Sequence, residues 1–208
     1  MKIIVAADDW QESHLRIEKE NATTLFVKNG ADFFQYTDAE VFIDLTLNVT
    51  EPHLQLLRNL LPQVVIVNSV LHTCTETDED FIRMNGWNTF LQSDKVEAAT
   101  KHGNKQKAER AFQALGKEVT WVPDVVGFIR PRVVSMIINE AYFALQEGVS
   151  KKEEINIAMK LGTNYPFGPF EWAETIGQKN VAALLKKLSL KQDRYSPAPN
   201  LVQEADML

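Results

Sequence analysis

The chain has too few cysteines and too few long apolar runs for several classes of protein. Cys74 is the only cysteine among 208 residues, which excludes an intrachain disulfide and a thiolate cluster around a metal ion. Only His72 is near it as a base, so we expect a buried or incidental thiol. No apolar run approaches the roughly 20 residues that cross a bilayer, and Asp8 comes too early for a signal peptide. We therefore expect a cytoplasmic protein with no metal site and no membrane contact.

Glycine is scarce in the first half of the chain, where Gly30 is the only glycine before Gly86. A turn that holds a dinucleotide needs glycines, because side chains keep the backbone away from the pyrophosphate. The first apolar segment is instead followed by Ala7-Asp8-Asp9-Trp10. Two carboxylates and a blocked backbone both oppose phosphate binding at this turn.

Positive charge is also in deficit. The net charge is −6, and residues 1–125 hold 12 Lys and Arg against 19 Asp and Glu, whereas residues 126–208 hold 10 against 9. Nucleic-acid binding depends on the neutralisation of phosphates by a basic surface. The small basic groups at Arg130 and Arg132 and at Lys151 and Lys152 do not supply such a surface, so we exclude nucleic acid as a partner.

The first half alternates strand and helix patterns. Continuous apolar or β-branched runs, typical of strands in a parallel sheet, occupy residues 2–7, 23–27, 40–45, 63–67 and 119–122. Between them, residues 51–61 and 104–115 have an apolar face at helical spacing, and Gly116 stands where a helix stops. The alternation predicts a doubly wound α/β sheet.

The second half reads as helices only. Val133–Leu145 is apolar on nearly all sides, which predicts a buried central helix. A Ser150–Glu153 capping box opens a helix that Gly162 stops, and further helices follow at Pro169 and at Val181–Leu188. Residues 193–208 are rich in turn residues and predict an extended or mobile tail. We expect domains at 1–124 and 125–192, followed by this tail.

Four separate stretches of the second half carry a family resemblance. They are Asp124–Ile129 followed by Arg132, Ala158–Gly162, Tyr165–Glu171, and Ile176-Gly177. In this order and spacing they closely resemble the signature of the 3-hydroxyacyl-CoA dehydrogenase family, strongly over residues 124–177 and weakly over 40–123. The resemblance implies a Rossmann-type domain, here degenerate, followed by an all-helical C-terminal domain that usually dimerises. It also implies NAD as oxidant and an acyl-CoA substrate.

The chain departs from this family at the residues that do the chemistry. The family's catalytic histidine lies in a strand of the type Gly-Leu-His-Phe-Phe, which matches Gly86–Phe90, so Asn88 stands in its place. Asparagine cannot take up and carry a proton at neutral pH. Glu97 matches the glutamate that orients the histidine, and we expect an ordinary charged residue there. Pro131 replaces an asparagine that contacts substrate, and it offers no side-chain hydrogen bond. We expect no bound cofactor, although the family uses NAD.

Other side chains are candidates for contact with a ligand. Ser69 and His72 follow the fourth predicted strand, and a relocated acid–base pair of His72 with Glu97 is an alternative that we keep. Arg130 and Arg132 are natural contacts for an anion near the domain junction, and Arg132 is equally suited to be a structural brace.

Three hypotheses about function remain open. The first is an inactive family member that keeps the fold, the dimer surface and a cleft for an acyl-CoA or another small acid. The second is a divergent active dehydrogenase or another acyl-CoA enzyme of fatty-acid metabolism, with Ser69, His72 and Glu97 as its working groups. The third is a non-catalytic interaction module that pairs with itself or with a relative through the helix at 133–145.

Overall fold

The computed structural model describes residues 1–15 and 22–207. The chain divides into two compact units, Met1–Phe128 and Ile129–Leu208, and each is described by itself. The boundary lies four residues after the one expected between residues 124 and 125.

The N-terminal unit is built on a seven-stranded sheet with the order β2-β1-β3-β4-β5-β6-β7. The strands are β1 (Lys2–Ala6), β2 (Thr23–Val27), β3 (Val41–Asp44), β4 (Val64–Asn68), β5 (Ile82–Met84), β6 (Lys95–Thr100) and β7 (Glu118–Trp121). The first five are parallel, β6 runs antiparallel to β5, and β7 is parallel to β6. All five predicted strands are present, while β5 and β6 were not predicted.

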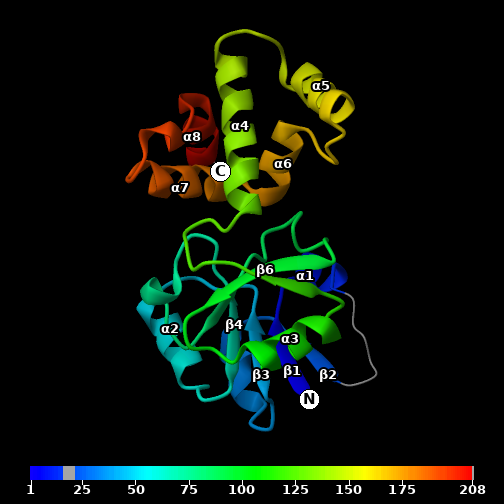
Figure 1. Ribbon diagram of the computed structural model, residues 1–208, viewed down its shortest axis with the longest axis vertical. Coiled ribbons are helices and arrows are strands. Elements are labelled where there is room, and N and C mark those ends of the chain that lie inside the picture. The colour runs from blue at the N-terminus through cyan, green and yellow to red at the C-terminus, as the bar shows by residue number, and fades with distance from the viewer. Residues whose placement is uncertain (16–21, 208) are drawn as a thin grey trace. The chain divides into compact units, whose positions relative to one another are not determined.

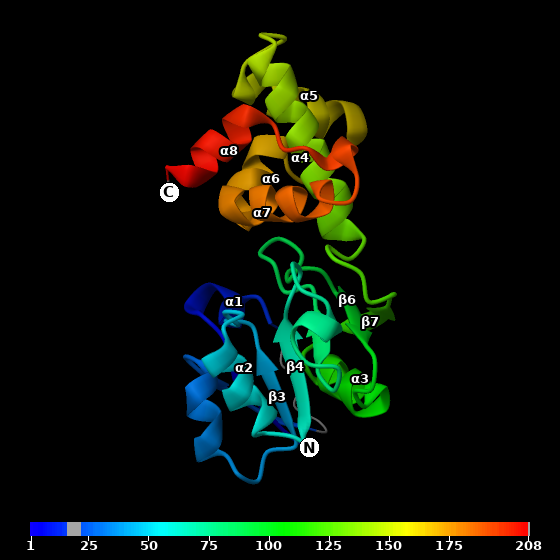
Figure 2. The same ribbon diagram turned by 90° about the vertical axis from the view of Figure 1, so that its left-hand side faces the viewer.

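Both faces of this sheet are covered, as a doubly wound fold requires. Successive residues of a strand point to opposite faces, so Ile3 and Val5 join one core with α3 (Lys105–Ala114), and Ile4 and Ala6 join the other. The second core includes side chains of α2 (Glu51–Arg58) and of the 3₁₀ helix η1 (Gly30–Gln35). Figure 2 shows α2 and α3 on opposite sides of strands β3 and β4.

The C-terminal unit is all-helical, and its long helix α4 packs against α6, α7 and α8 (Figure 1). The helices are α4 (Arg130–Gln146), α5 (Lys152–Thr163), α6 (Pro169–Ile176), α7 (Gln178–Ser189), the 3₁₀ helix η3 (Asp193–Tyr195) and α8 (Pro199–Asp206). None of the helices in the described part of the chain is long and apolar enough to cross a membrane.

The extended tail predicted for residues 193–208 is wrong. The side chain of Asn139 donates to the Ser196 carbonyl and accepts from the Ala198 amide, at 2.9 and 2.8 Å. Tyr142 Oη donates to Glu204 on α8 at 2.6 Å. These anchors lie 57 to 62 residues upstream, so α8 is an integral part of the unit.

Two helix ends of α5 also differ from the prediction. The helix begins at Lys152, and Ser150 bonds the side chain of Glu154 instead of forming the predicted box with Glu153. Gly162 lies inside the helix, because Asn164 takes the left-handed conformation that ends it, with φ of 56°. Asparagine is one of the few residues that adopts this conformation readily.

Candidate functional site

Polar residues gather where the parallel strands end. In a doubly wound sheet a ligand binds outside the carboxyl ends of the strands, at the point where the chain connections turn to opposite sides. Here that point lies between β1 and β3, since β1 leads to β2 on one side and β3 lies on the other. Asp8 follows β1, Asp44 ends β3, Asn68 ends β4 and Asn85 follows β5.

The first turn is closed by its own side chains. Asp8 caps α1 (Asp9–Ser13): its carboxylate accepts from the Gln11 amide at 2.7 Å, and the Gln11 side chain accepts from the Asp8 amide at 3.0 Å. The Gln11 amide is one of the first-turn amides that a phosphate at this helix N-terminus would use, and the Asp8 carboxylate already occupies it. The preceding Ala6 and Ala7 are fully buried. The turn therefore does not fit the pyrophosphate of a dinucleotide.

The residue that follows β2 also opposes the binding of a dinucleotide. About 20 residues after a nucleotide-binding turn, an acidic side chain holds the ribose of NAD. At that distance this chain has Lys28, directly after β2, and it forms an exposed ion pair with Asp9. The hydrogen bond to Lys28 lowers the pKa of Asp9, and the same bond raises the pKa of Lys28. NAD is thus disfavoured at the ribose as well as at the phosphates.

The buried Asp44 and the partly buried His53 form a pair that sequence reasoning did not find. His53 Nε2 donates to Asp44 Oδ2 at 2.8 Å, and Thr46 donates to Oδ1 through both its amide and its hydroxyl at 2.9 Å. Asp44 is fully buried. The bond to Asp44 raises the pKa of His53, although burial opposes this shift.

Gly30 makes room for this pair. A Cβ atom on Gly30 would lie 2.8 Å from Asp44 Oδ2 and 3.0 Å from His53 Nε2. The only feature of the sequence that indicated a special site was Asp44, an isolated carboxylate at the end of an apolar strand. Its pairing with His53, nine residues later on α2, could not be predicted, because it depends on how the strand and the helix pack.

Hydrogen bonds tie the ends of the central strands together. The carbonyl of Leu45 accepts from the side chains of Gln11 and Asn68, at 3.2 and 3.3 Å. Asn68 in turn accepts from the Gly86 amide at 2.9 Å. Hydrogen bonds thus connect Gln11, Leu45, Asn68 and Gly86 across this edge of the sheet.

The segment predicted to match the family's catalytic strand forms a turn instead. Gly86–Phe90 follows β5 as irregular chain, and Asn88 is half-buried there. Its neighbour Thr89 has φ of 78°, and the buried Thr89 hydroxyl has no hydrogen-bond partner among the described residues. A β-branched residue in this conformation costs on the order of 1–3 kcal/mol. Thr89 is therefore a point of local backbone strain beside Asn88.

Glu97 is not the ordinary charged residue that the sequence predicts. It is only 4% exposed, and Asn85 Nδ2 donates to its carboxylate at 3.1 Å. A buried carboxylate needs such a partner, because burial without hydrogen bonds is costly. Its pairing with His72 stays a prediction.

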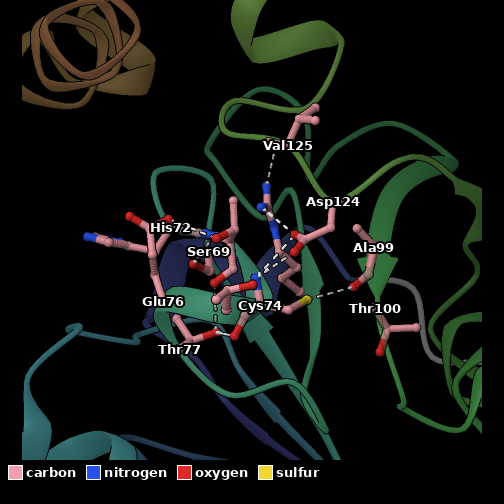
Figure 3. A network of polar contacts seen from close by, with 12 residues as sticks. Ser69, His72, Cys74, Glu76, Thr77, Ala99, Thr100, Asp124 and Val125 are labelled. Atoms are coloured by element: carbon pink, nitrogen blue, oxygen red, sulfur yellow. Dashed lines mark hydrogen bonds and ion pairs between the residues drawn. The ribbon is translucent and has the colours of Figure 1, made fainter. Parts of the chain in front are cut away.

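Ser69 and His72 share one loop (Figure 3). Ser69 is buried, and its hydroxyl donates to the His72 carbonyl at 3.0 Å. Ser69 and His72 belong to the N-terminal unit, whereas Arg130 and Arg132 belong to the C-terminal unit. The grouping of these four residues into one ligand site stays a prediction.

Figure 3 also shows a network around Asp124. The Asp124 carboxylate accepts from the Cys74 amide at 3.0 Å and from Arg83 Nη1 at 2.9 Å. Arg83 is fully buried, its second terminal nitrogen donates to the Val125 carbonyl, and its guanidinium lies 4.1 Å from the Phe128 ring centroid. Burial, with the nearby Asp124 charge, raises the pKa of Cys74 to about 12. Cys74 is therefore a buried thiol, as predicted.

Arg132 and Arg194 border an open groove of about 610 Å³ on α4, and Arg130, at the first position of α4, is not among the residues that line it. Pro131 is buried in the first turn of α4. The guanidiniums of Arg132 and Arg194 lie 5.8 and 4.7 Å from the ring centroid of Tyr195. Within residues 1–15 and 22–207, no group of three or more His, Cys, Asp or Glu side chains is placed to hold a metal ion.

Comparison with known proteins gives consistent matches. Residues 127–207 match the model of the 3-hydroxyacyl-CoA dehydrogenase C-terminal domain, a match that runs through α8. The chain is 41% identical over 102 residues to 3-hydroxyadipyl-CoA dehydrogenase of Escherichia coli, covering 48% of this chain and 22% of that protein. It is 34% identical over 139 residues to 3-hydroxybutyryl-CoA dehydrogenase of Bradyrhizobium diazoefficiens, covering 64% of this chain and 47% of that protein.

The chain thus spans less than half the length of these two relatives. Among solved structures, (S)-3-hydroxybutyryl-CoA dehydrogenase PaaH1 from Ralstonia eutropha aligns with a TM-score of 0.72 at 22% identity, over 88% of this chain and 70% of that one. At this identity the alignment supports the shared fold alone.

Proposed function

We propose that the chain is a member of the 3-hydroxyacyl-CoA dehydrogenase family, whose C-terminal domain model matches residues 127–207, and that it lacks NAD-dependent dehydrogenase activity. The single observation that carries this proposal is the self-capped first turn. The Asp8 and Gln11 amides at this turn are already bonded to the side chains of Gln11 and Asp8. A dinucleotide would have to displace these bonds and approach two carboxylates.

The residues at the family's catalytic positions support the same proposal. Asn88 offers an amide where the reaction needs a group that takes up and returns a proton, and an amide does neither at neutral pH. Pro131 has no side-chain polar group and is buried. We propose that the protein keeps the family fold, a homodimer through the C-terminal unit and a site for an acyl-CoA or another small acid. We also propose a cytoplasmic location, which suits the free buried thiol of Cys74.

A turnover assay tests this proposal. Purified protein is mixed with NADH and a short 3-oxoacyl-CoA, and the NADH absorbance is followed, with an active family dehydrogenase as the positive control. The proposal predicts no change above the rate without protein. Turnover that scales with protein concentration would overturn it.

A divergent active enzyme is the second candidate, and the Asp44–His53 pair is the observation that favours it. A histidine oriented by a buried carboxylate at the carboxyl edge of a parallel sheet is a recurring acid–base arrangement. Under this alternative, turnover is present and His53→Gln lowers it at least 100-fold, in line with the usual contribution of a general base of about 10²–10⁴.

A further inference from the structure

Glu97 has a partner directly across the sheet, at the end of the ladder between β5 and β6. The antiparallel register of these strands places Met84 opposite Ala98. The next residue, Asn85, therefore lies opposite Glu97, and its backbone amide donates to the Glu97 carbonyl at 2.9 Å. Asn85 thus extends the ladder one residue beyond Met84, where β5 ends.

The side chains of this cross-strand pair meet away from water. Both residues are buried, and Asn85 Nδ2 donates to Glu97 Oε2 at 3.1 Å. The other end of the Asn85 amide, Oδ1, accepts from the Trp87 amide at 3.4 Å. Residues directly opposite on neighbouring strands have Cβ atoms about 4.5–5.5 Å apart, so a side chain of similar reach at position 85 also faces the carboxylate. Glu97 is therefore built to orient a donor at that position.

Asn88 lies in a different local structure. It is half-buried in the irregular turn formed by residues 86–90, beside Thr89 with its positive φ. The resemblance implies a catalytic histidine that lies in a strand and is oriented by the glutamate that Glu97 matches. Position 85 meets both conditions, because it continues β5 and bonds Glu97. Position 88 does not lie in a strand.

We infer that Asn85 occupies the position of the family's catalytic histidine, and that Glu97 keeps its orienting role on an amide that cannot carry a proton. The family's strand, of the type Gly-Leu-His-Phe-Phe, is then matched by Arg83–Trp87, and the fully buried Arg83 stands at the glycine. This inference rests on the proposed family membership. It moves the amide at the catalytic position from Asn88 to Asn85 and leaves the proposed lack of a base unchanged.

Replacement of the amide by an imidazole tests this assignment. The Nδ2 atom of asparagine and the Nδ1 atom of histidine are both bonded to Cγ, so Asn85→His places a ring nitrogen before the Glu97 carboxylate. A nearby negative charge raises the pKa of an imidazole. We expect the pKa of the introduced ring, followed by NMR titration, to fall by about one unit or more when Glu97→Gln is added. Burial acts on the ring in both variants, so this difference isolates the contribution of Glu97.

Asn88→His is the matched control, since it introduces the same ring three residues away. Its pKa should not respond to Glu97→Gln. The wild-type spectrum identifies the signals of the four native histidines. An Asn88→His ring that responds as strongly as the Asn85→His ring overturns the inference, and so does an Asn85→His ring that does not respond.

A second set of variants decides the case if circular dichroism shows that Asn85→His does not fold. Asn85→Asp sets two carboxylates against each other across the strands, which is destabilising, and should lower the urea midpoint. Adding Glu97→Gln should restore the midpoint, because donor and acceptor are then exchanged. We expect no such rescue for Asn88→Asp. Rescue at position 88, or at neither position, overturns the inference.

These results are independent of the turnover assay with NADH and a 3-oxoacyl-CoA. Turnover would overturn the proposed loss of activity and would not alter the pairing of position 85 with Glu97. A titration or rescue that fails at position 85 would overturn the assignment of Asn85 and leave the proposed loss of activity standing, because that proposal is carried by the first turn.

Discussion

At the scale of single residues, Gly30 has a specific role beside the partly buried Asp44–His53 pair. Gly30→Ala would push a methyl group to within 3.0 Å of both side chains, and their hydrogen bond would break or stretch. We expect a loss of about 1–3 kcal/mol in the free energy of unfolding, the usual cost of an unsatisfied buried polar group. Urea denaturation measures this loss.

Gly162→Ala is the matched control. Gly162 lies in α5, and a Cβ atom added there would meet no other atom within 4 Å. Alanine is also a better helix former than glycine by about 0.5–1 kcal/mol. We therefore expect this change to be neutral or stabilising. Equal effects of the two substitutions would show that the close approach at Gly30 has no energetic consequence.

His53 gives the stability of the N-terminal unit a pH dependence with a definite sign. The bond to Asp44 raises its pKa in the folded protein above the unfolded value of about 6.5. The stabilisation by protonated His53 is therefore fully present below that unfolded pKa and is lost as the pH rises through the folded one. The free energy of unfolding of wild type minus that of His53→Gln should fall over this window. A difference that is constant or rises with pH would contradict the ion pair.

At the scale of elements, Arg83 and Asp124 join β5 to the segment that ends the N-terminal unit. Asp124→Ala removes the carboxylate that faces a fully buried guanidinium. Removing one partner of a buried ion pair costs about 3–5 kcal/mol, and we expect a loss of this size in urea denaturation. The Cys74 thiol should also react faster with a thiol reagent, because Asp124 binds the Cys74 amide.

Asp80→Ala serves as the control for this prediction. Asp80 is 59% exposed and pairs with the exposed His102, and an exposed pair contributes about 1 kcal/mol or less. A loss for Asp124→Ala no larger than that for Asp80→Ala would mean that the buried pair does not hold these elements together.

The local sequence pattern decides which elements could be predicted. Strands covered on both faces, such as β1 and β4, show as continuous apolar runs. β5 is three residues long and has Arg83 at its centre, so it lacks the continuous apolar run by which the other parallel strands are recognised. Helix α8 looked like a tail because its anchors, Asn139 and Tyr142, lie far away in the sequence.

At the scale of the whole molecule, the sequence showed the resemblance to the 3-hydroxyacyl-CoA dehydrogenase family and the absence of a glycine-rich first turn. Both depend on local features, namely short motifs and the absence of glycine before Gly30. It did not identify the Asp44–His53 pair or the burial of Glu97, since both depend on neighbours that only the folded sheet brings together. The first turn is therefore the feature that most strongly opposes NAD binding.

The most direct test of that account is isothermal titration calorimetry of the full chain with NAD⁺ and with NADH. An active family dehydrogenase is the positive control. The account predicts no binding tighter than about 1 mM, or roughly −4 kcal/mol, for either form. A dissociation constant in the micromolar range would contradict it, since the self-capped turn would then still hold a dinucleotide.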